Sequence, residues 1–181
     1  MYIGCIMNNH IETKNLLPRF WEKKSLKSLN MTEWEALCDG CGKCCLNKLE
    51  DENSGEVALT RVACRLLDDT TCRCAHYENR HQFVPECIVL KPANIDSHAY
   101  WMPETCAYRL LHTGQPLPDW HPLITGTSES VYNAGISVQG TTGREFDSAG
   151  EGWGEDVNEG PIGCFLLVTR RILYILRVWK G

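Results

Sequence analysis

The stretch Cys38-Asp-Gly-Cys41-Gly-Lys-Cys44-Cys45 places four cysteines within a single short segment. Two cysteines separated by two residues can bring their sulfurs roughly 3.8 Å apart on a tight turn, which is the separation that a tetrahedral metal with bonds of about 2.3 Å requires. Gly40 and Gly42 leave the backbone able to make that turn with its N–H groups directed at sulfur. Lys43 adds a positive charge, which favours thiolates. The stretch therefore predicts a metal-binding loop around which the fold is organised.

The side chains of Cys44 and Cys45 diverge because the two residues are adjacent. We therefore expect the two sulfurs to bind different metals, or only one of them to bind metal directly while the other lies next to that site. Five more cysteines follow along the chain, and nine in all suit either two four-cysteine sites plus one spare or one cluster plus a separate zinc site. Spacing leaves the pairing open. The predicted metal ligands are Cys38, Cys41, Cys44, Cys45, Cys64, Cys72, Cys74, Cys87 and Cys106.

The expected cofactor is an iron–sulfur cluster or zinc, and the residues leave both open. Three cysteines at this spacing also open the bacterial ferredoxin pattern, in which a later cysteine is followed by proline. Here Cys45 follows Cys44 immediately, which disfavours a plain ferredoxin but allows a four-iron cluster with a distant fourth ligand. The alternative is that the cysteines are buried core residues that bind no metal. We disfavour it because clustered thiolates bind soft metals readily.

Several polar residues near the cysteines are expected to be structural or solvated rather than ligands. His76 and His81 follow the Cys72-x-Cys74 pair and are interpreted as surface residues, although either could replace a sulfur. His121, between a tryptophan and a proline, is interpreted as structural. Asp39 and the acidic run at 50–52 are expected to be solvated charges. Cys5 and Cys164 lie near the ends of the chain and are not expected to bind metal.

Composition limits the function classes. The chain has 181 residues, which suits one domain, and its 18 basic and 23 acidic residues give a net charge of −5. Nucleic-acid binding is not expected, because no basic stripe stands out. The first ten residues lack the pattern of a secretory signal, so we expect a cytoplasmic protein with reduced thiols. The odd total of 11 cysteines also argues against a disulfide framework.

The local patterns predict short elements. Residues 30–38 favour a helix capped by Thr32 with Glu35 completing a capping box, and residues 56–62 alternate as a strand does. Pro92 is placed in the first turn of a helix running through residue 95, residues 105–114 form a helix capped by Thr105 and ended by Gly114, and a strand is expected at 136–138. The predicted fold class is α+β or largely irregular: a small metal-organised domain with short helices and few strands.

The chain divides into three expected parts. Residues 1–19 are interpreted as a weakly structured leader, residues 20–143 as the cysteine-cluster domain, and residues 144–181 as a disordered tail. The tail is acidic and Gly-rich at first and then apolar and basic. Arginines interrupt its apolar run, so we do not expect it to cross or contact a membrane.

These residues also carry a family resemblance. The chain resembles the YcgN-type CxxCxxCC cysteine-cluster proteins, which belong to the YkgJ-like group described as a zinc- or iron-chelating domain. The similarity runs from about residue 20 to 140, through W-E-A-L-C-D-G-C-G-K-C-C-L at 34–46, L-T-R-V-A-C-R-L-L at 59–67, C-R-C at 72–74 and P-E-T-C-A-Y-R-L-L at 103–111. The resemblance implies metal chelation in a bacterial cytosolic protein, with the nine cysteines as the matching positions. The tail after about residue 144 departs from the family.

Three functions remain open at this stage. The first is a metal or iron–sulfur protein without turnover, and the second is an iron–sulfur-dependent redox or modification enzyme, or an accessory to one. The third is an interaction module that zinc holds in shape. No serine–histidine–carboxylate set, phosphate loop or dinucleotide fingerprint is found, so no catalytic residue is predicted and an enzyme is disfavoured. The expected partners are metal ions, and a protein partner is left open.

Overall fold

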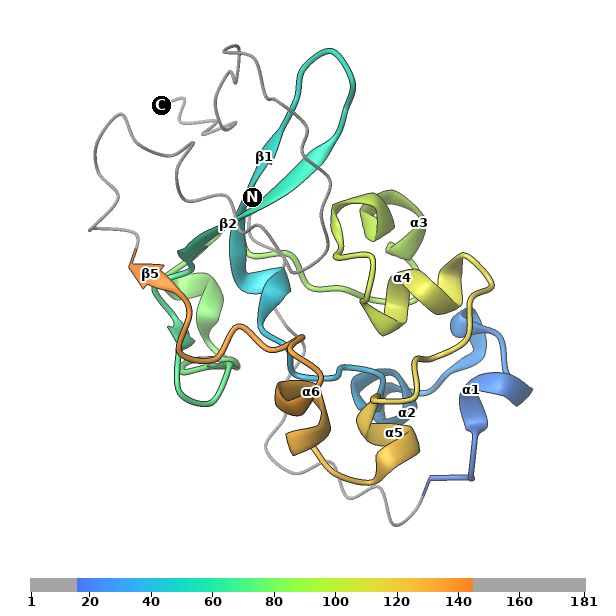
Figure 1. The fold of residues 1–181 in the computed structure, drawn as a ribbon. Coiled ribbons are helices and arrows are strands. Elements are labelled where there is room, and N and C mark those ends of the chain that lie inside the picture. The colour runs from blue at the N-terminus through green and yellow to red at the C-terminus, as the bar shows by residue number, and fades with distance from the viewer. Residues whose placement is uncertain (1–15, 145–181) are drawn as a thin grey trace.

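The computed structural model describes residues 16–144. Short elements wind irregularly around the centre of the molecule, with the β1–β2 hairpin at one end and most of the helices at the other (Figure 1). The helices are α1 (Phe20–Lys23), α2 (Met31–Ala36), α3 (Ile95–His98), α4 (Ala107–His112), α5 (Pro122–Thr125) and α6 (Glu129–Asn133), with 3-10 turns η2 (Leu26–Ser28), η3 (Lys43–Cys45), η4 (Arg80–Gln82) and η5 (Ala99–Trp101). The strands are β1 (Leu46–Glu50), β2 (Val57–Ala63), β3 (Leu67–Asp68), β4 (Arg73–Cys74) and β5 (Gly143–Arg144). The predicted α+β, irregular class is confirmed.

The larger sheet has the order β1-β2-β5. Strands β1 and β2 pair antiparallel from Leu46 opposite Ala63 to Glu50 opposite Val57, and β5 runs parallel to β2. The strand predicted at 56–62 is thus confirmed within one residue. The strand predicted at 136–138 is wrong, because this segment forms no ladder. Ile136 N and Ser137 N donate to Val131 O, and Val138 N donates to Cys41 O at 2.9 Å.

The main apolar core lies among the helices and is centred on Trp34 of α2, whose side chain is 0% exposed. Its indole ring lies 4.6 Å from the ring of Tyr108 in α4, and its Nε1 donates to the carbonyl of Leu90 at 3.2 Å. The hydroxyl of Tyr108 in turn donates to the carbonyl of Trp34 at 2.8 Å. A ring of this size buries about 150–250 Å², which contributes on the order of 4–6 kcal/mol before entropy is counted. The core therefore fixes α2, the helix that leads into the metal-binding loop.

The N-cap of helix α2 lies two residues earlier than predicted. Asn30, not Thr32, is the N-cap: its Oδ1 accepts from Glu33 N at 2.9 Å, and a Glu33 carboxylate oxygen accepts from Asn30 N at 3.0 Å. This is a complete capping box on the pattern Asn-x-x-Glu, which satisfies two backbone donors that the helix itself leaves unpaired. The carboxyl group of Glu35 therefore does not cap the helix.

Two other predicted boundaries also move. Helix α3 begins at Ile95 rather than at Pro92, because the side chain of Asn94 accepts from Lys91 N at 2.7 Å and donates to Val89 O at 2.9 Å, which holds a turn before the helix. Helix α4 has Cys106 rather than Thr105 at its N-cap. Its predicted end is confirmed by Gly114, whose φ is +75°.

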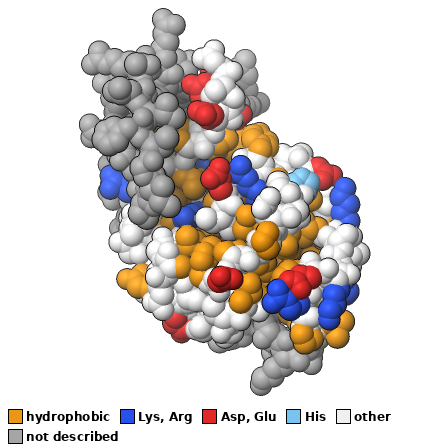
Figure 2. Space-filling model, turned by 45° about the vertical axis from the view of Figure 1, so that its right-hand side comes forward, with side chains coloured by type: hydrophobic (Ala, Val, Ile, Leu, Met, Phe, Trp, Pro, Cys, Tyr) orange, Lys and Arg blue, Asp and Glu red, His pale blue; other side chains and the backbone are white. Residues whose placement is uncertain are grey.

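The first described residues already pack against the main core. Leu16 is partly buried against the main core, and Phe20 in α1 is 1% exposed. Residues 1–15 of the leader predicted at 1–19, residues 145–181 of the tail predicted at 144–181, and both Cys5 and Cys164 lie outside the described residues, so the domain limits stay predictions. No helix between residues 16 and 144 is long and apolar enough to cross a bilayer. Hydrophobic side chains emerge between charged ones on the face shown in Figure 2.

Candidate metal centre

The loop from the end of α2 to the start of β1 carries the cysteines that decide the fold. Gly40 and Gly42 have φ values of +77° and +78°, in the left-handed region that the tight turn was predicted to need. The backbone N–H of Lys43 interacts with the sulfur of Cys41 and lowers its pKa, against a larger rise caused by burial. The expected turn, with an amide directed at sulfur, is therefore present.

Residues far along the chain close over this loop. A side chain at Gly42 would meet Val138 Cγ2 at 2.7 Å and Cys72 Sγ at 3.3 Å, so only glycine fits there. The hydrogen bond from Val138 N to Cys41 O holds the covering segment in place. The back of the loop is thus packed against protein, with Cys41 and Cys45 buried and Cys38 and Cys44 half-buried.

Eight of the nine predicted ligands fall into two neighbouring groups. In the first cysteine group, burial is the main cause that raises the pKa values of Cys41 and Cys106. The charge of Cys44 raises both pKa values further, and the charge of Cys38 raises that of Cys106. The second cysteine group surrounds Leu66 and Val84, and the backbone N–H of one member donates to the carbonyl of another at 2.8 Å. We call Cys38, Cys41, Cys44 and Cys106 the first cysteine group and Cys45, Cys64, Cys74 and Cys87 the second. The two groups are not separate: Cys38 and Cys44 also pack against the second group, and Cys44 adds to the rise that burial causes in the pKa of Cys87.

Cys72 lies apart from both groups. It packs with Leu46, Ala63 and Val138, and its Sγ lies 3.4 Å from the hydroxyl of Ser137. Its φ of +54° places it in the left-handed region, which is uncommon for a residue with a side chain. The sequence assigned Cys72 the same role as the other eight, and no residue spacing could have singled it out.

The thiols are gathered but not yet arranged as ligands. All nine described cysteines are present as thiols. Within residues 16–144, no three His, Cys, Asp or Glu side chains are disposed as a metal site. A zinc or iron–sulfur centre would fit the chemistry of the donors, since both favour sulfur ligands. It would also fit Asp39, one of whose carboxylate oxygens is buried without a hydrogen-bond partner among the described residues.

Asp39 is not the solvated charge that the sequence suggested. One carboxylate oxygen accepts from Cys41 N at 3.0 Å, and the other is buried with no hydrogen-bond partner among the described residues. Burial is the main cause that raises the pKa of Asp39. An orphaned carboxylate oxygen beside the first cysteine group is costly unless a proton or a cation compensates it. An unpaired buried carboxylate oxygen of this kind is expected in a site that binds a cation.

Lys48 is a buried cation that the sequence analysis did not single out. It is 5% exposed, and its Nζ donates to the carbonyls of Cys44 at 2.8 Å and Leu46 at 2.9 Å. Burial lowers the pKa of Lys48, while the surrounding cysteines raise it. Lys43, which was expected to supply the positive charge, is only half-buried. The register of β1 against β2 shifts between Leu46 and Lys48, and both side chains are buried.

Arg80 is a second buried cation and lies on the other side. Its guanidinium sits 4.2 Å from the ring centre of Tyr77, donates to the Tyr77 carbonyl, and lowers the pKa of Cys87, which burial raises. Nearby Glu35 has a pKa raised to about 7, mainly by burial, and one of its oxygens has no partner among the described residues. Arg80 forms part of no sequence motif, and Glu35 was assigned to a capping box instead.

The histidines behave as predicted. His76 and His81 are exposed, and the ring of His76 packs near that of Phe83. His121 is 0% exposed and structural: its Nε2 donates to Leu37 O and its Nδ1 accepts from Leu123 N, both at 3.1 Å. These two bonds require the neutral ring, with the proton on Nε2. His121 thereby ties the start of α5 to the end of α2.

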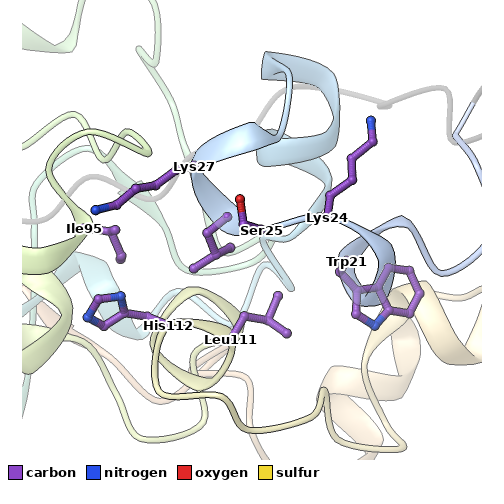
Figure 3. A pocket seen from close by; sticks show the side chains of 8 residues that line it. Trp21, Lys24, Ser25, Lys27, Ile95, Leu111 and His112 are labelled. Carbon is purple, nitrogen blue, oxygen red and sulfur yellow. The ribbon is translucent and has the colours of Figure 1, made fainter.

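A surface cavity of about 300 Å³ lies elsewhere, between the η2 segment and helices α3 and α4. Trp21, Ile95 and Leu111 supply apolar walls, and Lys27 and His112 lie at one side (Figure 3). Lys27 pairs with Asp96 at 3.0 Å, so its charge is already compensated. No cysteine lines this cavity. We therefore place the candidate site at the thiols, where the chemically distinctive groups gather.

Comparisons with known proteins agree with this location. A model of the CxxCxxCC family, described as "Putative zinc- or iron-chelating domain", matches residues 37–107. A UPF0260 protein of Rhodobacter capsulatus is 56% identical over 147 residues, which cover 81% of this chain and 98% of that protein. This chain belongs to the UPF0260 family of CxxCxxCC proteins.

Other UPF0260 members match somewhat less of the chain. The protein of Rhizorhabdus wittichii is 58% identical over 132 residues, covering 73% of this chain and 89% of its own, and that of Caulobacter vibrioides is 52% identical over 127 residues, covering 70% and 78%. No solved structure matches the chain. The resemblance predicted from the cysteine spacing is confirmed, and the matched range of 37–107 contains both cysteine groups.

Proposed function

We propose that this UPF0260 protein is a cytosolic metal-binding protein that holds zinc or an iron–sulfur cluster through its clustered cysteines. The observation that carries the proposal is the concentration of eight thiols and one orphaned carboxylate oxygen around the loop at 38–45. The family's description as a zinc- or iron-chelating domain supports it. The metal supplies either a redox-inert tetrahedral centre or an electron-transfer centre, depending on which one is bound.

The thiols need a metal to become anionic. Burial raises the pKa values of Cys41, Cys87 and Cys106, so each of these thiols holds its proton without a compensating cation. Metal binding replaces those protons with coordinate bonds, and the free energy of binding is added to that of folding. We therefore expect the apoprotein to be much less stable than the loaded protein.

The proposal is tested by measuring zinc, iron and acid-labile sulfide per chain on full-length protein purified without oxygen. Iron with a matching amount of sulfide supports a cluster and moves the search towards electron transfer or modification chemistry. Zinc without sulfide supports a structural centre and moves the search towards a protein partner. Protein that is folded, reduced and free of all three, and that takes up none on reconstitution, would overturn the proposal.

A further inference from the structure

Two buried cations beside the cysteines form no ion pair with the described part of the chain. Lys48 is 5% exposed and Arg80 is 6% exposed, and no carboxylate of residues 16–144 forms an ion pair with either of them. Taking an unpaired charge out of water is costly, so buried charges are ordinarily paired or lie beside a metal centre. The two cations therefore call for a compensating negative charge.

Lys48 is held in place by the metal-binding loop itself. Its Nζ donates to the carbonyls of Cys44 at 2.8 Å and Leu46 at 2.9 Å, which carry only partial negative charge. A protonated thiol is neutral and compensates nothing, whereas a thiolate beside an ammonium attracts it strongly at low dielectric. The thiols that act on the charge of Lys48 come from both cysteine groups and are Cys41, Cys44, Cys45 and Cys106.

Arg80 lies in a similar position beside Cys87. Its guanidinium lies 4.2 Å from the ring centre of Tyr77 and donates to the Tyr77 carbonyl, but its Nε is buried with no hydrogen-bond partner between residues 16 and 144. Its charge acts on the thiol of Cys87 and on the carboxyl of Glu35. Burial raises the pKa of Glu35 to about 7, so this carboxyl is only partly ionised at neutral pH and does not fully compensate Arg80.

A metal bound by thiolates would supply the missing negative charge. Zinc or a four-iron cluster held by four thiolates is net negative, because the charges of the thiolates exceed the positive charge of the metal. Burying such a centre is favourable only where cations compensate it. A centre of neutral or positive net charge would instead be destabilised by two buried cations.

We propose that Lys48 and Arg80 are the charge-compensating residues of the metal centre, and that they restrict the chain to a centre whose net charge is negative. This role rests on the proposed function, and it is independent of which thiols bind the metal and of how many ions they share. Both residues act on the thiolates through their charge and bind no metal themselves.

The sign of the charge is tested by titrating the reduced, metal-free full-length chain with Co²⁺ at neutral pH. Sulfur-to-cobalt absorption follows thiolate coordination, and calorimetry in two buffers of different ionisation enthalpy counts the protons released. We expect about three to four protons for each cobalt ion, because the thiols lose more positive charge than the ion brings. Release of about two protons or fewer would overturn the inference, because the site would not become more negative.

Variants test the two residues separately. Lys48→Met and Arg80→Met should each weaken Co²⁺ binding by about tenfold or more in competition with a chelator, because the anionic centre loses one compensating cation. Arg80→Lys keeps the charge and should recover most of the loss, which a purely structural role of the guanidinium would not predict. Lys24→Met removes a lysine that is already paired with Glu33 and should bind Co²⁺ as the wild type does.

The opposite results separate the two proposals. An affinity within about threefold of the wild type for either methionine variant, or an Arg80→Lys variant as weak as Arg80→Met, would overturn the inference while leaving metal binding itself intact. A wild-type chain that binds no Co²⁺ would instead overturn the proposed function. The proton count is made on the wild type, so it decides the sign of the charge even if a methionine variant does not fold.

Discussion

Substituting Gly42 by alanine tests whether the metal-binding loop is closed as tightly as the structure shows. The φ of +78° strains any residue with a side chain by about 1–2 kcal/mol. The added methyl group would also lie 2.7 Å from Val138 Cγ2 and 3.3 Å from Cys72 Sγ. Overpacking of this kind costs about 1–3 kcal/mol. We therefore expect Gly42→Ala to lower the free energy of unfolding by about 2–5 kcal/mol, a large share of the stability of a typical domain.

The control for backbone strain is Gly114→Ala. Gly114 has nearly the same φ, +75°, but an added Cβ there would meet nothing within 4 Å. This variant should therefore lose only the conformational contribution of about 1–2 kcal/mol. Urea unfolding of the three proteins, followed by tryptophan fluorescence at fixed metal content, gives both differences. The excess cost of Gly42→Ala over Gly114→Ala measures the crowding at the loop.

A second variant locates the source of the crowding. Val138→Ala removes the methyl group nearest to the added Cβ, so the double variant Gly42→Ala/Val138→Ala should be less destabilised than the sum of the single variants. Residues in contact commonly couple by about 0.5–3 kcal/mol. If Gly42→Ala costs no more than Gly114→Ala, or if the two changes are additive, the segment at 136–138 does not press against the loop and the packing argument fails.

Three further predictions concern buried charges. Burial lowers the pKa of His121, so its neutral ring should stabilise the fold above about pH 6.5 and lose that contribution as the pH falls below it. His121→Asn keeps an acceptor for the backbone, and its urea stability should fall less than that of the wild type between pH 7 and 5; parallel falls would contradict this. Glu35 has a pKa raised to about 7, so its ionisation should destabilise the fold as the pH rises from about 5 through 7. Glu35→Gln should therefore gain stability relative to the wild type between pH 5 and 8, and a constant difference would refute the assignment. Lys48→Met should speed metal release to a chelator by about tenfold or more, because a buried anionic centre loses a buried compensating cation. Lys24→Met, which breaks an ion pair with Glu33, should leave the release rate unchanged. Equal rates for wild type and Lys48→Met would exclude this role for Lys48.

The parts of the fold that follow from local chemistry could be predicted from the sequence. The spacing of the cysteines and the two glycines between them indicated a tight turn, and both glycines do have positive φ. The alternation at 56–62 indicated the strand that became β2, because a half-buried strand buries every second residue. The cysteine pattern also indicated the family that the comparisons confirm.

The start of α2 shows why other parts could not be predicted. Asn30-x-x-Glu33 and Thr32-x-x-Glu35 are both capping-box patterns, and they overlap. The choice between them depends on tertiary packing, because Trp34 has to face the core, and the sequence pattern is silent on that direction. Because Glu35 was assigned to the capping box, its buried carboxyl oxygen was not predicted.

The charges around the thiols were missed for a different reason. Asp39, Lys48 and Arg80 are residue types that ordinarily lie in water, so their expected position is the surface. All three are buried here or have a buried atom, because cysteines from distant parts of the chain gather beside them. No spacing rule reports such contacts. An inward-facing charge next to a predicted metal loop is visible only once the chain is folded.

The hydrogen bond between Val138 and Cys41 gives protein synthesis a part in the assembly of this site. The loop at 38–45 leaves the ribosome early, whereas the segment that covers it is translated almost a hundred residues later. Cys87 and Cys106 also emerge only after the loop, so the nascent chain presents Cys38, Cys41, Cys44 and Cys45 to the cell before their distant neighbours exist. Contacts of such long sequence separation form slowly. During synthesis there is therefore a period in which the thiols of the loop are exposed to oxidation and to binding of the wrong metal. This period ends only when the segment that contains Val138 has been translated and packs over the loop.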